Sequence, residues 1–185
     1  MEARRLVEFA CGWDPGQQIA SPDRTLSPDQ CTWLADAMQR RLEDEPLSRI
    51  LGRREFWGLD LSIAGATLDP RADTETLVEL VLDTCAKRTQ PPAHILDLGT
   101  GSGAILLALL SHYPGATGMG IDQSPETLGV ARQNAANLGF AARTEFVLGD
   151  WLSGVEGRFD LIVSNPPYIP TEDLLNLARN VREFD

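Results

Sequence analysis

The sequence predicts an α/β protein in which a parallel-sheet domain follows a small helical domain and a β-hairpin. From His94 onward, short apolar runs alternate with helical segments of about 10–15 residues, a pattern typical of β-α-β units. A glycine-rich turn at 97–103 lies between the first apolar run and the next helix. Because a helix between two strands returns the chain to the same end of the sheet, these units imply parallel strands.

Residues 1–53 are predicted to form the helical domain. One helix is well marked at its start, because Ser27 can act as N-cap, Pro28 occupies the first helical position and Gln30 completes a capping box. In the helix that begins at Pro28, apolar residues recur at helical spacing; they are Cys31, Leu34, Ala35, Met38 and Leu42. Residues 54–69 are predicted to form a β-hairpin that links the two domains.

The third predicted unit is the sheet domain, residues 70–185. It begins with a helix near Asp73 whose buried face is expected to include Leu77, Val78, Val81 and Cys85. The expected strands are 95–98, 118–121, 144–148 and 159–163, and the expected helices between them are 104–110 and 125–138.

Composition limits the possible functions. The net charge of −11 and the absence of a Lys/Arg cluster argue against direct binding to nucleic acid. Three cysteines without a CxxC pair predict neither a disulfide framework nor a metal site, and they favour a reduced, cytoplasmic setting. No apolar run approaches the roughly 20 residues of a membrane span, and the N-terminus lacks the apolar core of a signal peptide.

The glycine-rich turn is the first candidate ligand site. Glycines permit a tight turn and let a ligand approach the backbone closely. The spacing is GxGxG rather than the GxGxxG of dinucleotide folds, and no lysine follows, which excludes a P-loop. Asp97 precedes the first glycine and could hold a cationic or hydroxylated ligand. A glycine-rich turn without a ligand is the alternative. The candidate residues are Asp97, Gly99, Thr100, Gly101, Ser102 and Gly103.

Two later strand ends also carry acids. Asp122 ends the second predicted strand, where a carboxylate can accept hydrogen bonds from two ribose hydroxyls. It could instead be the N-cap of the following helix. Asp150 and Trp151 follow the third strand and could bind an adenine amine and cover its ring. The alternative for this pair is a surface loop with a core tryptophan.

The fourth predicted strand is followed by Asn165, Pro166, Pro167 and Tyr168. Two successive prolines cannot continue a helix or a central strand. They present carbonyl groups without competing N–H donors, next to an amide side chain and an aromatic ring. This set of groups suits a planar NH2 group that must be gripped by acceptors and covered by a ring.

Together these features fit S-adenosylmethionine (AdoMet), whose adenosine would lie across the carboxyl ends of the strands. The stretches 97–105 and 165–169 resemble class I AdoMet-dependent methyltransferases, which have a Rossmann-like fold. They are also similar to the release factor glutamine methyltransferase family, called PrmC or HemK. Two further stretches agree with that family, 46–59 and 70–79, although the family usually has a proline where Ala72 stands.

The resemblance implies methyl transfer from AdoMet to the side-chain amide nitrogen of the glutamine in the GGQ motif of peptide chain release factors, with S-adenosyl-L-homocysteine as the product. Asn165 and Pro166 would each accept one N–H of the glutamine amide, and Tyr168 would pack on its plane beside Pro167. Asn165 would also border the cofactor. The helical domain would supply a docking surface for the release factor, and catalysis would consist chiefly of positioning.

Two alternatives remain open. DNA adenine-N6 methyltransferases use a similar element on an exocyclic NH2, but a flipped base needs a basic surface to hold the phosphates. The chain could also bind AdoMet without turnover. The family continues well past Asp185, and such a sheet normally has about three more strands beyond the fourth. We therefore expect that the sheet domain is incomplete here and that the chain is a fragment.

Overall fold

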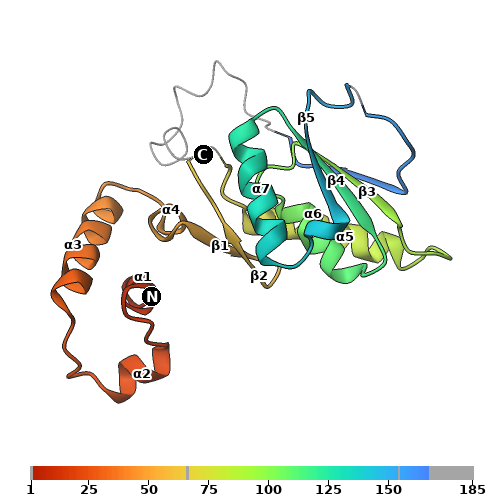
Figure 1. The fold of residues 1–185 in the computed structure, drawn as a ribbon. Coiled ribbons are helices and arrows are strands. Elements are labelled where there is room, and N and C mark those ends of the chain that lie inside the picture. The colour runs from red at the N-terminus through yellow and green to blue at the C-terminus, as the bar shows by residue number, and fades with distance from the viewer. Residues whose placement is uncertain (1, 66, 154, 167–185) are drawn as a thin grey trace.

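The computed structural model describes residues 2–65, 67–153 and 155–166. The N-terminal part contains four helices and a hairpin: α1 (Glu2–Cys11), α2 (Pro15–Ala20), α3 (Pro28–Leu42), α4 (Leu47–Leu51), β1 (Arg53–Phe56) and β2 (Leu59–Ser62). The elements that follow are α5 (Ala72–Cys85), β3 (His94–Leu98), α6 (Ala104–His112), β4 (Thr117–Asp122), α7 (Pro125–Asn137), the 3₁₀ turn η1 (Ala141–Arg143), β5 (Thr144–Leu148) and β6 (Leu161–Ser164). The hairpin lies between the first four helices and the sheet (Figure 1).

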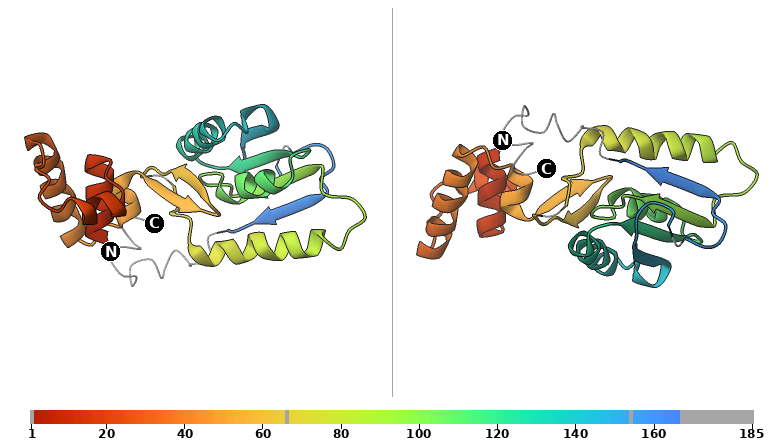
Figure 2. Two further views of the ribbon diagram at one scale, coloured as in Figure 1. Left: turned by 90° about the horizontal axis from the view of Figure 1, so that it is seen from below. Right: turned by 90° about the horizontal axis from the view of Figure 1, so that it is seen from above.

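The four strands after the hairpin form one parallel sheet in the order β5-β4-β3-β6. This confirms the predicted parallel α/β fold. Leu98 pairs with Ile121 on one side and with Ser164 on the other, so the carboxyl ends of neighbouring strands lie together at one edge. Helix α5 runs alongside β6 in both views of Figure 2. Among the described residues, β6 pairs with β3 alone.

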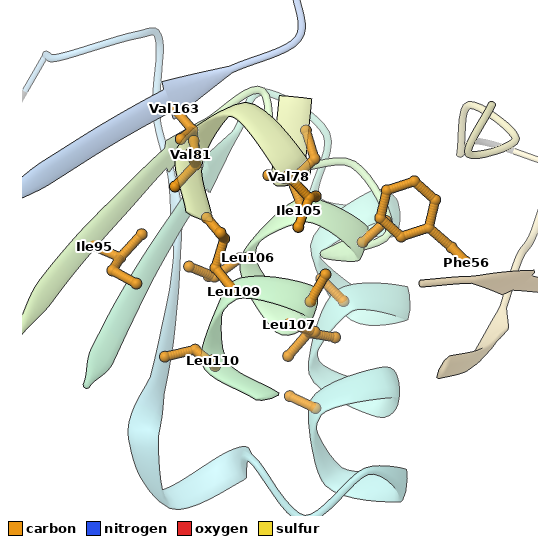
Figure 3. Packing of buried hydrophobic residues seen from close by; sticks show 14 of the residues in the cluster. Phe56, Val78, Val81, Ile95, Ile105, Leu106, Leu107, Leu109, Leu110 and Val163 are labelled. Atoms are coloured by element: carbon orange, nitrogen blue, oxygen red, sulfur yellow. The ribbon is translucent and has the colours of Figure 1, made fainter. Parts of the chain in front are cut away.

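The main core lies between one face of the sheet and helices α5, α6 and α7. Helix α6 is buried on all sides, because every residue from Ala104 to Leu110 is buried. Figure 3 shows the leucines of α6 among Ile95, Val78 and Val81. Each fully buried leucine contributes about 1.5–3 kcal/mol relative to an exposed one, so α6 is a main source of stability for the sheet domain.

Helix α6 packs closely because β4 has no side chain at Gly118. A Cβ atom added at this position would lie 2.6 Å from Cδ1 of Leu106. Both residues are buried, and overpacking of a dense core forces side chains and backbone to shift. Gly118 is therefore what allows the helix to approach the sheet.

We expect Gly118→Ala to lower the free energy of unfolding by about 1–3 kcal/mol, the usual cost of overpacking. Urea denaturation measures this change. Gly115→Ala is the matched control, since Gly115 is exposed and, apart from its chain neighbours, no described residue has an atom within 4 Å of an added Cβ there. Equal stability of the two variants would contradict the close packing of α6 on β4.

The N-terminal helices have a core of their own, made of Leu6, Leu34, Ala37 and Ile50. The predicted capping box is present: Ser27 Oγ accepts from the backbone N–H of Gln30, and the Gln30 side chain accepts from the N–H of Ser27. Strands β1 and β2 pair antiparallel, which confirms the β-hairpin predicted within residues 54–69. The division of the chain into domains at 53 and 69 stays a prediction.

Two predicted boundaries were wrong. The helix after β3 continues beyond residue 110 to His112, and β6 begins at Leu161 rather than at Phe159. Phe159 instead packs on the opposite face of the sheet from α6, in a small cluster with Leu96 and Ile121. Asp160 then fixes the chain before the strand, because its carboxylate accepts from the N–H groups of Ala93 and His94 at 2.8 and 2.9 Å. Within the described ranges, no helix is long and apolar enough to cross a membrane.

Candidate active site

The candidate residues gather at the carboxyl edge of the parallel sheet. In the spatial order β5-β4-β3-β6, Asp150 lies just after β5, Asp122 is the last residue of β4, the loop 99–103 follows β3 and Asn165 follows β6. This edge is where ligands bind in open α/β sheets. The predicted cofactor residues therefore occupy neighbouring strand ends, with Asn165 on the β6 side of the loop.

The glycine-rich loop is held by the end of β4. The carbonyl oxygen of Ile121 accepts from the N–H groups of Gly99 and Thr100, each at 2.9 Å. The carboxylate of Asp122 accepts from the N–H of Gly101 at 3.0 Å. Gly103, the N-cap of α6, has a φ of 82°, a left-handed conformation that favours glycine. Hydrogen bonds from three of its backbone N–H groups thus fix the loop. Its conformation at Gly103 is one that residues with a side chain rarely adopt.

Asp122 also binds the turn that follows β4. Its second oxygen accepts from the N–H of Ser124 at 3.0 Å. The N-cap of α7 is Ser124, whose hydroxyl accepts from the N–H of Thr127, so the alternative that Asp122 is this N-cap was wrong. A carboxylate has about four acceptor sites. Two are used here, which leaves capacity for two further donors such as vicinal hydroxyls.

Asp97 is fully buried. One of its oxygens accepts from the hydroxyl of Thr100 at 2.8 Å. The other oxygen has no hydrogen-bond partner among the described residues. Burial raises the pKa of Asp97 to about 7, and the hydroxyl of Thr100 and the nearby backbone N–H of Leu106 offset this only in part. A buried carboxylate with an unsatisfied oxygen is costly unless a donor or a cation completes it.

Asp150 lines an open pocket of about 320 Å³ together with Gln123, Leu148 and Gly149, and Trp151 is the next residue in the chain. The carboxylate of Asp150 accepts from the side chain of Gln123 at 2.5 Å. Trp151 is 48% exposed and has a φ of 52°, so the alternative of a core tryptophan was wrong. The proposed contacts of Asp150 and Trp151 with adenine stay predictions.

Asn165 lies directly after β6 and is half-buried. Its side-chain NH2 donates to the hydroxyl oxygen of Thr74, in the first turn of α5, at 3.3 Å. The preceding residue, Ser164, donates from its hydroxyl to the carbonyl oxygen of Leu98 at 2.8 Å and so fixes the end of β6 against β3. Pro166 is exposed, and Pro167 and Tyr168 lie outside the described residues.

Three residues near the site were missed from the sequence. They are Thr74, which contacts Asn165; Gln123, which contacts Asp150; and Asn134, whose NH2 donates to the carbonyl oxygen of Ser102 at 2.9 Å. Asn134 carried the clearest signal, because a polar residue on the buried side of an apolar helix must find partners. The side chains of Thr100 and Ser102 are buried, so these two residues shape the loop from within.

Comparison with known families agrees with this geometry. A family model described as a methyltransferase domain matches residues 90–183, just over half of the chain. The chain belongs to the methyltransferase domain family. A second model, described as the PrmC N-terminal domain, matches residues 1–52. The resemblance found in the sequence motifs is thereby confirmed for both parts of the chain.

Relatives and solved structures extend this result. A protein of Rhodospirillum rubrum named release factor glutamine methyltransferase is 50% identical, over 100% of this chain and 56% of that protein. A protein of Escherichia coli with the same name is 40% identical, over 93% of this chain and 61% of that protein. The chain thus spans roughly three fifths of these relatives. A SAM-dependent methyltransferase of Agrobacterium tumefaciens has the same fold, with a TM-score of 0.52 at 16% identity, over 62% of this chain and 39% of that one.

Proposed function

We propose that this methyltransferase domain and its N-terminal helices transfer a methyl group from AdoMet to the side-chain amide nitrogen of the GGQ glutamine in peptide chain release factors. The observation that carries the proposal is the half-buried carboxamide of Asn165 at the end of β6, next to the glycine-rich loop that follows β3. Relatives of 40–50% identity bear the name of this activity.

The residues at the sheet edge fit AdoMet. One buried oxygen of Asp97 has no hydrogen-bond partner among the described residues and would be stabilised by a donor or a positive charge. AdoMet carries both an ammonium and a sulfonium group. Asp122 retains acceptor capacity for ribose hydroxyls. Asp150, which lines the open pocket beside β5, would bind the adenine, and Trp151 would cover its ring. When bound, AdoMet supplies an electrophilic methyl group with a neutral thioether as leaving group.

The protein's own contribution would be to orient the substrate amide. An amide nitrogen is a poor nucleophile because its lone pair is delocalised into the carbonyl group. Acceptance of its two N–H groups by the side-chain oxygen of Asn165 and the carbonyl oxygen of Pro166 would fix the nitrogen relative to the methyl group. Such positioning is worth several kcal/mol of the barrier. Pro167 and Tyr168 would complete the contact with the amide plane.

The proposed partner is a protein rather than a nucleic acid. A net charge of −11 would repel a phosphate backbone. The helices α1 to α4 would form the docking surface for the release factor. We place the reaction in the reduced cytoplasm, in keeping with the free thiols of Cys11, Cys31 and Cys85.

Methyl transfer from labelled AdoMet to a purified release factor tests the proposal. The full protein is expected to label the factor at the GGQ glutamine, as shown by mass spectrometry. Asn165→Ala is expected to lower the rate about 100-fold, the usual effect of removing one preorganised polar group, with the affinity for AdoMet changed far less. Label on DNA instead of the factor would overturn the proposal in favour of an adenine methyltransferase, and AdoMet binding without transfer would show a cofactor-binding fragment.

A further inference from the structure

The first turn of α5 touches two separate parts of the molecule. Thr74 accepts a hydrogen bond from the side-chain NH2 of Asn165, a residue 91 positions later in the chain. The next residue, Glu75, accepts from the backbone N–H of Trp57 in the hairpin turn at 2.9 Å. The start of α5 is therefore anchored to the hairpin on one side and to the strand end that bears Asn165 on the other.

This contact decides how the carboxamide of Asn165 is presented. An asparagine side chain has a donor end and an acceptor end of nearly equal shape, and its function depends on which end faces the ligand. With the NH2 group donating to Thr74, the oxygen is the end of the Asn165 carboxamide that this contact leaves free. No hydrogen bond to this oxygen is found among the described residues, so it remains available as an acceptor.

We propose that Thr74 is a positioning residue, which holds the carboxamide of Asn165 with its oxygen free to accept an N–H from the substrate amide. This inference rests on the proposed function. Thr74 is half-buried and its hydroxyl oxygen is the acceptor at 3.3 Å. Without that acceptor, the carboxamide can rotate and present its NH2 group, a donor, to a substrate NH2 that also only donates.

Thr74→Val removes the hydroxyl at nearly constant volume, and Thr74→Ser keeps it. We expect Thr74→Val to lower kcat for methyl transfer to the release factor by about tenfold, the upper range for one hydrogen bond. The KM for AdoMet and the thermal midpoint should stay near wild type, and Thr74→Ser should recover most of the rate. Thr76→Val is the control, because Thr76 is an exposed residue in the same turn.

A second measurement does not depend on activity. The side-chain NH2 of Asn165 gives a pair of NMR signals, which should shift in Thr74→Val but not in Thr74→Ser or Thr76→Val. A wild-type rate in Thr74→Val with unshifted signals would overturn the inference. Equal loss in Thr74→Ser would also overturn it, since the hydroxyl would then not be the active group. If the wild type labels no release factor, the proposed function fails, and the NMR signals alone decide whether Thr74 orients Asn165.

Discussion

Replacement of Asn134 by alanine is expected to lower the free energy of unfolding by about 3 kcal/mol, the upper end of the usual cost of a single substitution. Asn134 lies on α7 and is only 1% exposed. Its side-chain oxygen accepts from the N–H of Ser62 at 2.7 Å, and its NH2 donates to the carbonyl oxygens of Ser62 and Ser102 at 3.0 and 2.9 Å.

The loss is large because the amide satisfies three backbone groups at once. It pairs with both the N–H and the carbonyl of Ser62, much as a neighbouring strand would extend β2. Its third hydrogen bond holds the glycine-rich loop at Ser102. Alanine would leave these groups without partners and open a small cavity, and each buried unpaired polar group costs about 1–3 kcal/mol. The substitution should therefore loosen both the hairpin and the loop.

Urea denaturation of Asn134→Ala beside Asn137→Ala measures this effect. Asn137 lies on the same helix but is exposed, and its side-chain oxygen accepts from the side chain of Gln133. Because both variants replace asparagine by alanine in one helix, the gain in helix propensity is similar in both and cancels. We expect a change within about 0.5 kcal/mol for the control. Similar losses in the two variants would contradict the bridging role of Asn134.

The positions of the candidate residues could be predicted because they follow from strand ends. Apolar runs at 95–98, 118–121 and 144–148 marked three strands, and parallel pairing brings their carboxyl ends to one edge. Asp122 and Asp150 were placed at this edge by counting from those runs. The pairing of β3 with β6, which sets Asn165 beside the loop, depends on a crossover that the local sequence does not encode.

The partners of these residues could not be predicted. Thr74 and Asn165 are 91 positions apart, and Ser62 and Asn134 are 72 apart. Periodicity shows which side of a helix is buried, but it does not show what a polar side chain there will meet. The predicted start of β6 was wrong for a related reason. The apolar Phe159 precedes the strand and packs from a loop, and Asp160 binds the start of β3.

The buried carboxylate of Asp97 implies a conflict between stability and cofactor binding. Its pKa is raised by burial to about 7, whereas an aspartate in an unfolded chain has a pKa of about 3.9. A raised acid pKa means that folding disfavours the ionised form. Below a pH of about 4, Asp97 is protonated in both the folded and the unfolded state, and folding is most favourable there. The free energy of unfolding then falls as the pH rises from about 4 to about 7, because only the unfolded state ionises readily in this range.

Asp97→Asn removes this ionisation while keeping the shape of the side chain. Relative to wild type, the variant is expected to gain up to about 2 kcal/mol of unfolding free energy between pH 5 and pH 7, with little further gain above that. Urea denaturation across this range measures the difference. Asp83→Asn, at an exposed position of α5, is the matched control for an Asp-to-Asn change. A pH-independent difference for Asp97→Asn would contradict the burial of an ionisable carboxylate.

The same substitution should weaken binding of AdoMet. A neutral amide cannot compensate a cationic ligand, and loss of a charge-assisted contact of about 1.5–3 kcal/mol corresponds to roughly 10- to 100-fold in affinity. In the wild type, binding should tighten as the pH rises through about 7, because Asp97 then becomes ionised; in Asp97→Asn this dependence should disappear. Titration calorimetry at pH 6 and pH 8 checks both expectations. A variant that is more stable at pH 8 and also binds AdoMet as tightly as wild type would show that the carboxylate of Asp97 serves the fold rather than the cofactor.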